Sequence, residues 1–339
     1  MKAVRAVDYH TAGEPFRIVE RPPVALPGGT VAERRANAVE DNAARELREL
    51  LCFEPRGHAD MYGGFIVPPD DEGADLGVLF WHKDGFSTAC GHGAIALGVW
   101  ALDSGTVSPD PSSTTDVVID VPSGRVTARV TTTPEGRPLA VDFINVPSYV
   151  LHCEVAVETS RGRVLVDVAY GGALYAHLPA SSVGLSVTTE HYHSLIDIGR
   201  EIKWALTDSP WARHPADDRL SGIYGTILYD DLGIDRSTGS VHQRNITVFA
   251  DGEVDRSPCG SGTGSRVAAL AADGTLHPGQ VLLHDSIVGT RFYAQWQECV
   301  TVDGQDAVIP QVNGMAFRTG RHLFEHDPAD PLGRGFVLR

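Results

Sequence analysis

Two cysteines in this sequence stand where a glycine-rich turn meets the start of an expected helix. Residues 255–267 read DRSPCGSGTGSRV and place Cys259 directly before Gly260. Residues 87–98 read STACGHGAIALG and place Cys90 in the same Cys-Gly-x-Gly setting. The dipole and the free N–H groups of a helix N-terminus stabilise a thiolate and so lower the pKa of a cysteine there. The sequence therefore predicts two reactive thiols, each at the start of its own helix.

A matched pair of thiols is suited to inverting a carbon centre. If the two helix starts face each other, a carboxylate can lie between them, held by N–H groups from both. The sulfurs of Cys90 and Cys259 would then flank the carbon attached to that carboxylate. One thiolate removes the α-proton, and the opposite thiol returns a proton to the other face. This arrangement is that of a two-base racemase.

Other uses of these cysteines explain fewer of the residues. A phosphate-binding loop needs glycines and a lysine at fixed spacing after a strand, and no lysine follows Cys259 in its block. A nucleophilic cysteine paired with a histidine, as in hydrolases, would use Cys90 and His92 but leave Cys259 without a role. A metal site made by Cys90 and His92 has poor spacing for a closed tetrahedral site. In the plainest alternative, each cysteine is a small residue that fills a tight turn. The occurrence of both cysteines in the same sequence motif argues against this alternative.

The composition bounds the classes of function. The chain has 339 residues and a formal net charge of −16, so no nucleic-acid or anionic-membrane partner is expected. No apolar run is long enough to span a bilayer, and the N-terminus lacks the apolar core of a secretion signal; we therefore expect a cytoplasmic location. The five cysteines include no Cys-x-x-Cys pair, which argues against a disulfide framework and the commonest zinc sites. Cys52, Cys153 and Cys299 are interpreted as small core residues.

The elements that must hold the two cysteines are mainly strands. A strand-like run precedes each cysteine block, LGVLFWH at 76–82 and NITVFA at 245–250, and this repetition indicates a duplicated half. Alternating apolar residues on both sides of Pro122-Ser123-Gly124 predict a hairpin there.

The long helices are fewer than the strands. Apolar residues fall on one helical face over 33–51 and again over 189–206. Grouped strands with a few long helices predict an α+β fold. The length fits two domains of ordinary size. We expect an N-terminal half, 1–150, that carries Cys90, and a C-terminal half, 151–324, that carries Cys259, with the segment 325–339 packing back on the first half.

Four blocks of the sequence resemble the proline racemase family, which comprises proline racemases, 4-hydroxyproline 2-epimerases and trans-3-hydroxy-L-proline dehydratases. The blocks are DYHTAGEPFRIV (8–19), EPRGHADMYGG (54–64), ACGHG (89–93) and DRSPCGSGT (255–263). The resemblance runs almost from end to end. It implies two pseudo-symmetric domains of the diaminopimelate-epimerase type with the active site in the cleft between them. It also implies that neither pyridoxal phosphate nor a metal is used.

The resemblance also assigns roles to single residues. It implies that Cys90 and Cys259 are the two acid/base groups and that Asp255 holds the ring nitrogen of the substrate. The backbone donors to the substrate carboxylate would be those of Gly91, His92, Gly260 and Ser261. Asp255 has a plainer alternative as a turn or capping residue, because acidic side chains favour such places.

The reaction within the family stays open between two alternatives. The blocks at 82–98, 170–176 and 223–231 look more like the dehydratase branch, yet that branch typically carries threonine where this chain has Cys259. A second thiol is what reversible inversion requires, so a racemase or 2-epimerase acting on proline or hydroxyproline is preferred. The alternative is a trans-3-hydroxy-L-proline dehydratase that yields a pyrroline-2-carboxylate.

Three further expectations complete the sequence-based prediction. An inactive or binding-only member is the alternative of another class, and no residue favours it. A homodimer is the assembly considered. Tyr62, Tyr175 and Phe249 lie near the matched blocks, but the sequence does not place the walls of the pocket that would contact a ring hydroxyl.

Overall fold

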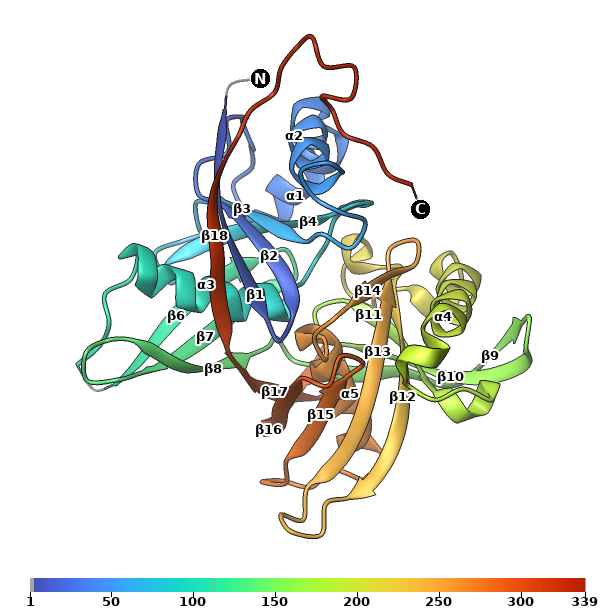
Figure 1. Cartoon of the computed structure of the whole chain (residues 1–339). Helices are drawn as coiled ribbons and strands as arrows, with labels where there is room; N and C mark the ends of the chain where they lie inside the picture. Colours follow the sequence, from blue (N-terminus) through green and yellow to red (C-terminus); the bar gives the residue numbers. More distant parts are fainter. Residues whose placement is uncertain (1–2, 112, 339) are drawn as a thin grey trace. The chain divides into compact units, whose positions relative to one another are not determined.

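The computed structural model describes residues 3–111 and 113–338, and Figure 1 shows the path of the chain. The chain forms two compact units: unit 1 is Met1–Val141 with Met315–Arg339, and unit 2 is Asp142–Gly314. Helices and strands occur in both units, which confirms the predicted α+β class. The domain extents expected from the sequence, 1–150 and 151–324 with 325–339 returning to the first half, stay predictions.

The strands of unit 1 pair in the order β18–β1–β2–β3–β4–β6–β7, and the short β5 pairs with β4. The hairpin predicted at Pro122-Ser123-Gly124 joins β6 to β7, with Val121 opposite Gly124. The bounds are β1 (Val4–Thr11), β2 (Glu14–Val19), β3 (Gly63–Val67), β4 (Leu76–His82), β5 (Gly85–Phe86), β6 (Thr114–Val121), β7 (Gly124–Thr132) and β18 (Ala316–Phe324); β8 (Pro138–Ile144) leads on to unit 2.

The strands of unit 2 pair in the order β9–β10–β11–β12–β13–β15–β16–β17, and the short β14 pairs with β13. Their bounds are β9 (Tyr149–Thr159), β10 (Gly162–Tyr170), β11 (Leu174–Pro179), β12 (Ile223–Ile234), β13 (Val241–Phe249), β14 (Glu253–Asp255), β15 (Leu282–Ser286), β16 (Arg291–Val302) and β17 (Gln305–Gly314). Short 3₁₀ helices lie at Ala180–Val183, Thr189–His191, Pro210–Ala212 and Asp218–Leu220.

The two units repeat one series of strand pairings. From β18 to β7 the pairs are antiparallel, antiparallel, parallel, antiparallel, parallel and antiparallel. From β9 to β16 the series is the same. Both crossovers between parallel strands carry helices: α1 (Val31–Glu40) and α2 (Asn42–Cys52), then α3 (Gly91–Ser104), in unit 1; α4 (Tyr192–Thr207), then α5 (Gly260–Ala272), in unit 2. The duplicated half expected from the two cysteine blocks therefore extends to the connectivity of each unit.

The helix predicted over 33–51 is two helices. α1 ends at Glu40, and Asp41 has an extended backbone. The Asp41 side chain accepts the N–H of Ala44 at 2.7 Å and so caps α2. The prediction over 189–206 is close, because a 3₁₀ turn at Thr189–His191 leads into α4.

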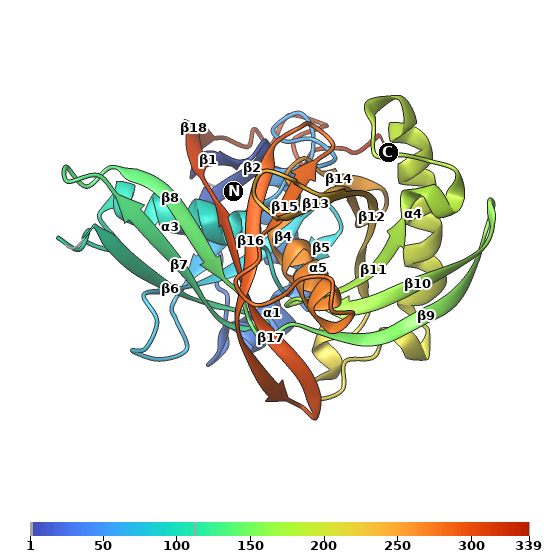
Figure 2. The same ribbon diagram turned by 90° about the horizontal axis from the view of Figure 1, so that it is seen from below.

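The helix of each unit that begins at a cysteine lies in its core. Every residue of α3 from Gly91 to Leu102 is buried, and α3 packs on β1, β2, β6, β7 and β18. α5 is buried from Gly260 to Leu270 and contacts β9, β10, β11, β16 and β17, as Figure 2 shows. Burial of one large aliphatic side chain contributes about 1.5–3 kcal/mol to the free energy of folding. The packing of these two helices therefore fixes the position of their first residues.

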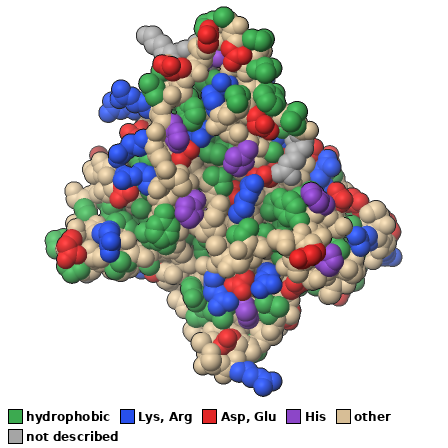
Figure 3. Space-filling view, viewed as in Figure 1, with side chains coloured by type: hydrophobic (Ala, Val, Ile, Leu, Met, Phe, Trp, Pro, Cys, Tyr) green, Lys and Arg blue, Asp and Glu red, His purple; other side chains and the backbone are tan. Residues whose placement is uncertain are grey.

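Charged side chains of both signs are interspersed on the surface, as the face in Figure 3 shows. Among residues 3–111 and 113–338, no helix is long and apolar enough to cross a membrane.

Candidate active site

Cys90 is the N-cap of α3. Its backbone is extended, with φ −158° and ψ 99°, and its Sγ accepts the N–H of Gly93 at 3.3 Å. The carbonyl of Cys90 accepts the N–H of Ala94 at 3.0 Å, which starts the helical ladder. The side chain is buried, with 7% of the residue exposed. The sulfur thus takes the place that a serine or threonine oxygen usually has at a helix start.

The imidazole of His92 lies beside this sulfur. Its Nδ1 and Nε2 are 3.5 Å and 3.6 Å from Cys90 Sγ. The ring is held edge-on by Phe16 and Tyr62, with centroids 5.8 Å and 5.0 Å away, and Thr11 donates its hydroxyl to the His92 carbonyl at 2.8 Å. The imidazole of His92 therefore contacts Cys90, as the alternative of a cysteine–histidine pair expected, whereas the family resemblance implied only a backbone donor at this residue.

Cys259 is the N-cap of α5 and repeats the arrangement in unit 2. Its Sγ accepts the N–H of Gly262 at 3.3 Å, and its carbonyl accepts the N–H of Thr263 at 2.8 Å. The residue is 6% exposed. Its backbone differs from that of Cys90, because φ is +65°, a region that costs a residue with a side chain roughly 1–3 kcal/mol. The surrounding structure holds this thiol in a strained position.

The second glycine of each Cys-Gly-x-Gly turn is required by the sulfur. A Cβ on Gly93 would lie 2.8 Å from Cys90 Sγ and 2.5 Å from the Phe16 ring. A Cβ on Gly262 would lie 2.9 Å from Cys259 Sγ and 2.8 Å from Ile227 Cδ1. Carbon atoms do not approach other heavy atoms this closely without displacement. The glycines therefore permit the thiols to cap the helices.

The remaining predicted residues occupy the first turns of these helices. Gly91 and His92 follow Cys90, and Gly260 and Ser261 follow Cys259, so all four are the first two positions of their helices. N–H groups at these positions have no partner within the helix. Ser261 Oγ is buried without a hydrogen-bond partner among the described residues. Each helix start is thus a ready site for an anionic group.

Asp255 lies in the turn that leads to Cys259. Its Oδ1 accepts the N–H and the hydroxyl of Ser257 at 2.8 Å and 2.7 Å. Ser257 Oγ in turn accepts the N–H of Cys259 at 3.0 Å. Asp255 is buried, with 4% exposed. The turn role that the sequence offered as an alternative is present, and a substrate role for Asp255 remains a prediction.

An aromatic cluster adjoins Cys259. Tyr175 OH is 3.8 Å from Cys259 Sγ, and the Tyr175 ring meets Tyr224 edge-on at 5.5 Å. Tyr224 stacks on Phe249 at 5.8 Å between centroids. Of the three aromatic residues singled out in the sequence, Tyr62 therefore lies by His92 in unit 1, and Tyr175 and Phe249 belong to the Cys259 side in unit 2.

The protonation of Cys259 departs from the sequence-based expectation. Burial, and then the Asp255 carboxylate, raise the pKa of Cys259 well above its ordinary value; the N–H of Gly262 and the hydroxyls of Tyr175 and Thr247 lower it by less. The prediction of a lowered pKa is wrong here because a helix dipole contributes about 0.3–1 kcal/mol, whereas full burial shifts a pKa by up to about 3–5 units. The burial of Cys259 and the nearby carboxylate both favour its neutral thiol form. Thr247, in the strand before the turn, carried no signal in the sequence.

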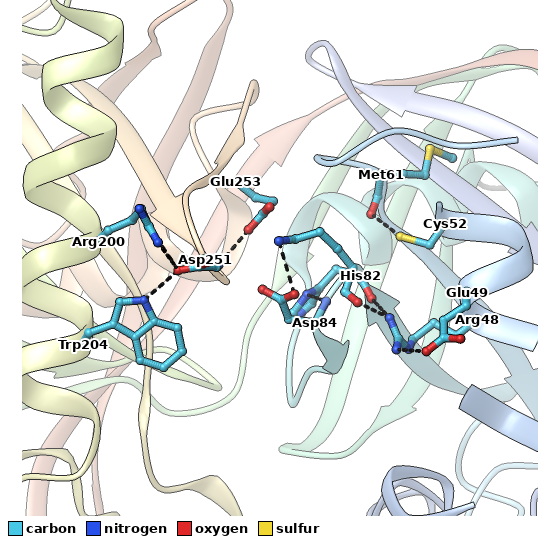
Figure 4. A network of polar contacts seen from close by, with 11 residues as sticks. Arg48, Glu49, Cys52, Met61, His82, Asp84, Arg200, Trp204, Asp251 and Glu253 are labelled. Atoms are coloured by element: carbon cyan, nitrogen blue, oxygen red, sulfur yellow. Dashed lines mark hydrogen bonds and ion pairs between the residues drawn. The ribbon is translucent and has the colours of Figure 1, made fainter. Parts of the chain in front are cut away.

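In unit 1, a helix holds the hairpin that precedes the cysteine. Arg48 of α2 donates to the carbonyls of His82 and Lys83, the first at 2.8 Å, and pairs with Glu49 at 3.5 Å (Figure 4). Hydrogen bonds from a charged donor contribute about 1.5–3 kcal/mol each. Because Arg48 is only 5% exposed, it fixes the β4–β5 turn firmly.

In unit 2, α4 holds the corresponding hairpin. Asp251, in the β13–β14 turn, accepts from Arg200 Nη2 at 2.7 Å and from Trp204 Nε1 at 2.9 Å (Figure 4). The Arg200 and Asp251 side chains are 45% and 41% exposed, and exposed ion pairs contribute at most about 1 kcal/mol. The same architectural task is therefore performed by a stronger contact in unit 1.

The other three cysteines lie outside the two helix caps. Cys52 is buried, but Cys153 and Cys299 are exposed, so the prediction of small core residues is wrong for these two. Each lies on a long strand with an exposed face, β9 and β16. Within the described part of the chain, no group of three or more His, Cys, Asp or Glu residues could hold a metal ion.

The chain is similar to known proteins over its whole length. A family model described as proline racemase matches residues 6–337. The sequence is 44% identical over 339 residues to a 3-hydroxyproline 2-epimerase of Burkholderia multivorans, covering 100% of this chain and 99% of the relative. It is 40% identical over 337 residues to a trans-3-hydroxy-L-proline dehydratase of Bacillus cereus, covering 99% and 98%.

Solved structures give the same similarity. A hydroxyproline epimerase from Agrobacterium vitis with bound trans-4-hydroxy-L-proline superposes with a TM-score of 0.91 at 31% identity, covering 100% of this chain and 97% of that one. A probable proline racemase from Agrobacterium radiobacter with bound carbonate gives 0.91 at 31%, covering 99% and 96%. A PhzF-family protein from Bacillus anthracis, 11% identical with a TM-score of 0.57 and covering 95% of this chain and 99% of that one, shares the fold alone.

Proposed function

The chain belongs to the proline racemase family, and from that premise we propose that it is a cofactor-independent enzyme that inverts the α-carbon of proline or a hydroxyproline. The observation that supports this proposal is the repeated thiol cap: in each unit a buried cysteine sulfur accepts the N–H of the third helical residue at 3.3 Å. Two such groups are what stereoinversion by proton transfer requires.

The proposed reaction uses one thiol on each face of the substrate. A thiolate takes the α-proton, and the electron pair of the broken C–H bond spreads into the carboxylate. The N–H groups of Gly91, His92, Gly260 and Ser261 stabilise the growing negative charge of that carboxylate. The opposite thiol then donates its proton to the other face of the carbon. At the end the thiol and the thiolate have exchanged places, so the enzyme is ready for the reverse reaction.

The raised pKa of Cys259 suits the form of the enzyme in which Cys259 is the proton donor and Cys90 the base. The other form, with Cys259 as thiolate, serves the opposite enantiomer. In both forms we assign the ring nitrogen of the substrate to Asp255, whose carboxylate lies in the turn before Cys259.

We propose 3-hydroxyproline as the first substrate to test. The relatives named above, an epimerase at 44% and a dehydratase at 40% identity, are both named for 3-hydroxyproline. The dehydratase function is the second candidate because similar relatives carry that name, including one of Azospirillum brasilense at 43% identity. In that reaction a thiolate removes the α-proton, the electron pair of the broken C–H bond forms a double bond to the neighbouring ring carbon, and the 3-hydroxyl takes a proton from an acid group and leaves as water. Cys259 favours inversion, since a threonine hydroxyl is too weak an acid to exchange protons in both directions.

The test incubates the purified protein with L-proline, trans-4-hydroxy-L-proline and trans-3-hydroxy-L-proline in deuterated water. Chiral chromatography reports inversion, and mass spectrometry reports deuterium at the α-carbon and loss of water. We expect an inverted, deuterated product. Loss of water from the 3-hydroxy compound without inversion of any substrate would contradict the preferred function and support the second. The Cys153→Ala variant, which removes an exposed thiol, is the matched control and should behave as wild type.

A homodimeric assembly and a cytoplasmic location also stay proposals. Light scattering of the purified protein tests the first, and cell fractionation tests the second.

A further inference from the structure

The neighbours of the Cys259 sulfur include groups that can form a hydrogen bond with it as a thiol or as a thiolate. A thiol needs an acceptor for its S–H, and a thiolate needs donors. The N–H of Gly262 can only donate, and the Asp255 carboxylate opposes a thiolate. A hydroxyl does both, because its oxygen accepts and its hydrogen can turn to donate. The Tyr175 hydroxyl, 3.8 Å from Cys259 Sγ, is such a group.

Tyr175 is held in place by its surroundings. It lies in β11 between Ala169 of β10 and Gly225 of β12. The residue is 1% exposed, and its ring packs edge-on against Tyr224 at 5.5 Å. A tyrosine fixed by two flanking strands and a neighbouring ring loses little further entropy when its hydroxyl bonds to the sulfur. The hydroxyl is therefore preorganised toward Cys259.

The groups that face Cys259 come from several elements. Asp255 on β14 raises the pKa of the thiol, and the Tyr175 and Thr247 hydroxyls, on β11 and β13, and the α5 amide lower it. Tyr224 on β12 packs against the same cluster. Because burial has removed water from the sulfur, each remaining donor has a larger effect than it would have at the surface.

We propose that Tyr175 is a positioning residue for Cys259. The Tyr175 hydroxyl accepts a hydrogen bond from the Cys259 thiol and donates one to the Cys259 thiolate, so that this sulfur can act as acid in one direction of the reaction and as base in the other. The inference rests on the proposed function. Unit 1 provides an imidazole, His92, beside its thiol instead. The assignment makes the two half-sites chemically unequal, and it predicts that the loss of one tyrosine hydroxyl affects one thiol only.

The test measures the pH dependence of the reactivity of the Cys259 sulfur in the absence of substrate. Iodoacetamide alkylation of Cys259 is followed from pH 6 to 11 by peptide-resolved mass spectrometry, in wild type and in Tyr175→Phe. The loss of one hydrogen bond to a charged group should move the pH midpoint upward by roughly 1–2 units. Tyr149→Phe, which removes a buried hydroxyl bonded to His214 at 3.0 Å, is the matched control and should leave the Cys259 midpoint unchanged. An unchanged midpoint in Tyr175→Phe would overturn the proposal.

A second substitution guards against misfolding. Incorporation of 3-fluorotyrosine at position 175 keeps the shape of the side chain and makes the hydroxyl a stronger donor, so the Cys259 midpoint should move downward. A shift in the same direction as that of Tyr175→Phe, or no shift, would contradict the proposal.

The two proposals fail separately. If the protein inverts no substrate but the midpoints shift as expected, the proposed function is wrong, and what stands is the hydrogen bond of Tyr175 to the Cys259 sulfur without its role in inversion. If inversion is normal and the midpoints do not move, the reverse holds. In an active enzyme, Tyr175→Phe should also shift the pH profile of kcat/KM in the direction that uses Cys259 as the base, with less effect in the direction that uses Cys90.

Discussion

The surroundings of Cys90 and Cys259 share the helix cap and the burial of the sulfur, and they differ in backbone conformation and in the polar side chains nearby. Both sulfurs cap a buried helix and accept an N–H at 3.3 Å. Cys90 has an extended backbone and an imidazole neighbour. Cys259 has a φ of +65° and lies among a tyrosine hydroxyl, a threonine hydroxyl and a carboxylate. A repeated motif therefore fixes the position of a sulfur in its helix, while its acidity depends on side chains from other elements.

Removal of either thiol should have the largest effect on the rate of inversion. We expect Cys90→Ala and Cys259→Ala each to lower inversion by at least about 100-fold, because proton transfer by a positioned group contributes about 10²–10⁴-fold. Chiral chromatography of the proline and hydroxyproline panel measures this loss. Near-normal inversion in either variant would show that the pair does not act as two bases. Thermal unfolding should confirm that both variants are folded.

Threonine substitution should separate the two thiols. Cys259→Thr keeps a hydroxyl but loses a group that readily becomes an anion. We expect inversion to be lost while the α-hydrogen still exchanges on the face served by Cys90. Cys90→Thr is the companion and should retain exchange on the opposite face. Deuterium incorporation into each enantiomer measures this, and exchange of the same enantiomer in both variants would be incompatible with one thiol per face.

Filling the glycine behind each sulfur should affect the two half-sites unequally. The Cβ of either alanine would press on the neighbouring sulfur; that of Gly93→Ala would also meet the buried Phe16 ring, whereas that of Gly262→Ala would also meet the flexible end of Ile227. We expect Gly93→Ala to cost about 1–3 kcal/mol of unfolding free energy and Gly262→Ala to cost less. Urea unfolding measures both. Combining each alanine with Cys90→Ala or Cys259→Ala should recover part of the loss, and full additivity would rule out the clash with sulfur.

The smallest effect concerns stability at alkaline pH. The pKa of Cys259 is raised in the folded protein, so its contribution is complete below the unfolded value of about 8.5 and declines as the pH rises toward the folded value. Above about pH 8.5 wild type should lose stability faster than Cys259→Ser, by at most about 1.4 kcal/mol per pH unit. Urea midpoints between pH 7 and 10 measure this difference. Parallel pH profiles for the two proteins would contradict the burial of the thiol.

The sequence by itself determined the features that depend on near neighbours in the chain. A helix cap is made by residues three positions apart, so Cys90 with Gly93 and Cys259 with Gly262 could be predicted as helix starts. Alternating apolar residues likewise predicted the β6–β7 hairpin. The four matched blocks identified the family, which the comparisons confirm. The helix expected over 33–51 failed at a local detail, the cap formed by Asp41.

Only the tertiary structure decided how each thiol is tuned. The sequence predicted a lowered pKa for both, since the dipole is a property of the helix alone. The burial of Cys259 and its contact with Tyr175 on β11 depend on elements that are distant in the sequence. The contact of Arg48 with the carbonyls of His82 and Lys83 has the same origin. Solvation and long-range hydrogen bonding are set by the packing of elements that no local pattern encodes, and for a buried sulfur they outweigh the local field of the helix.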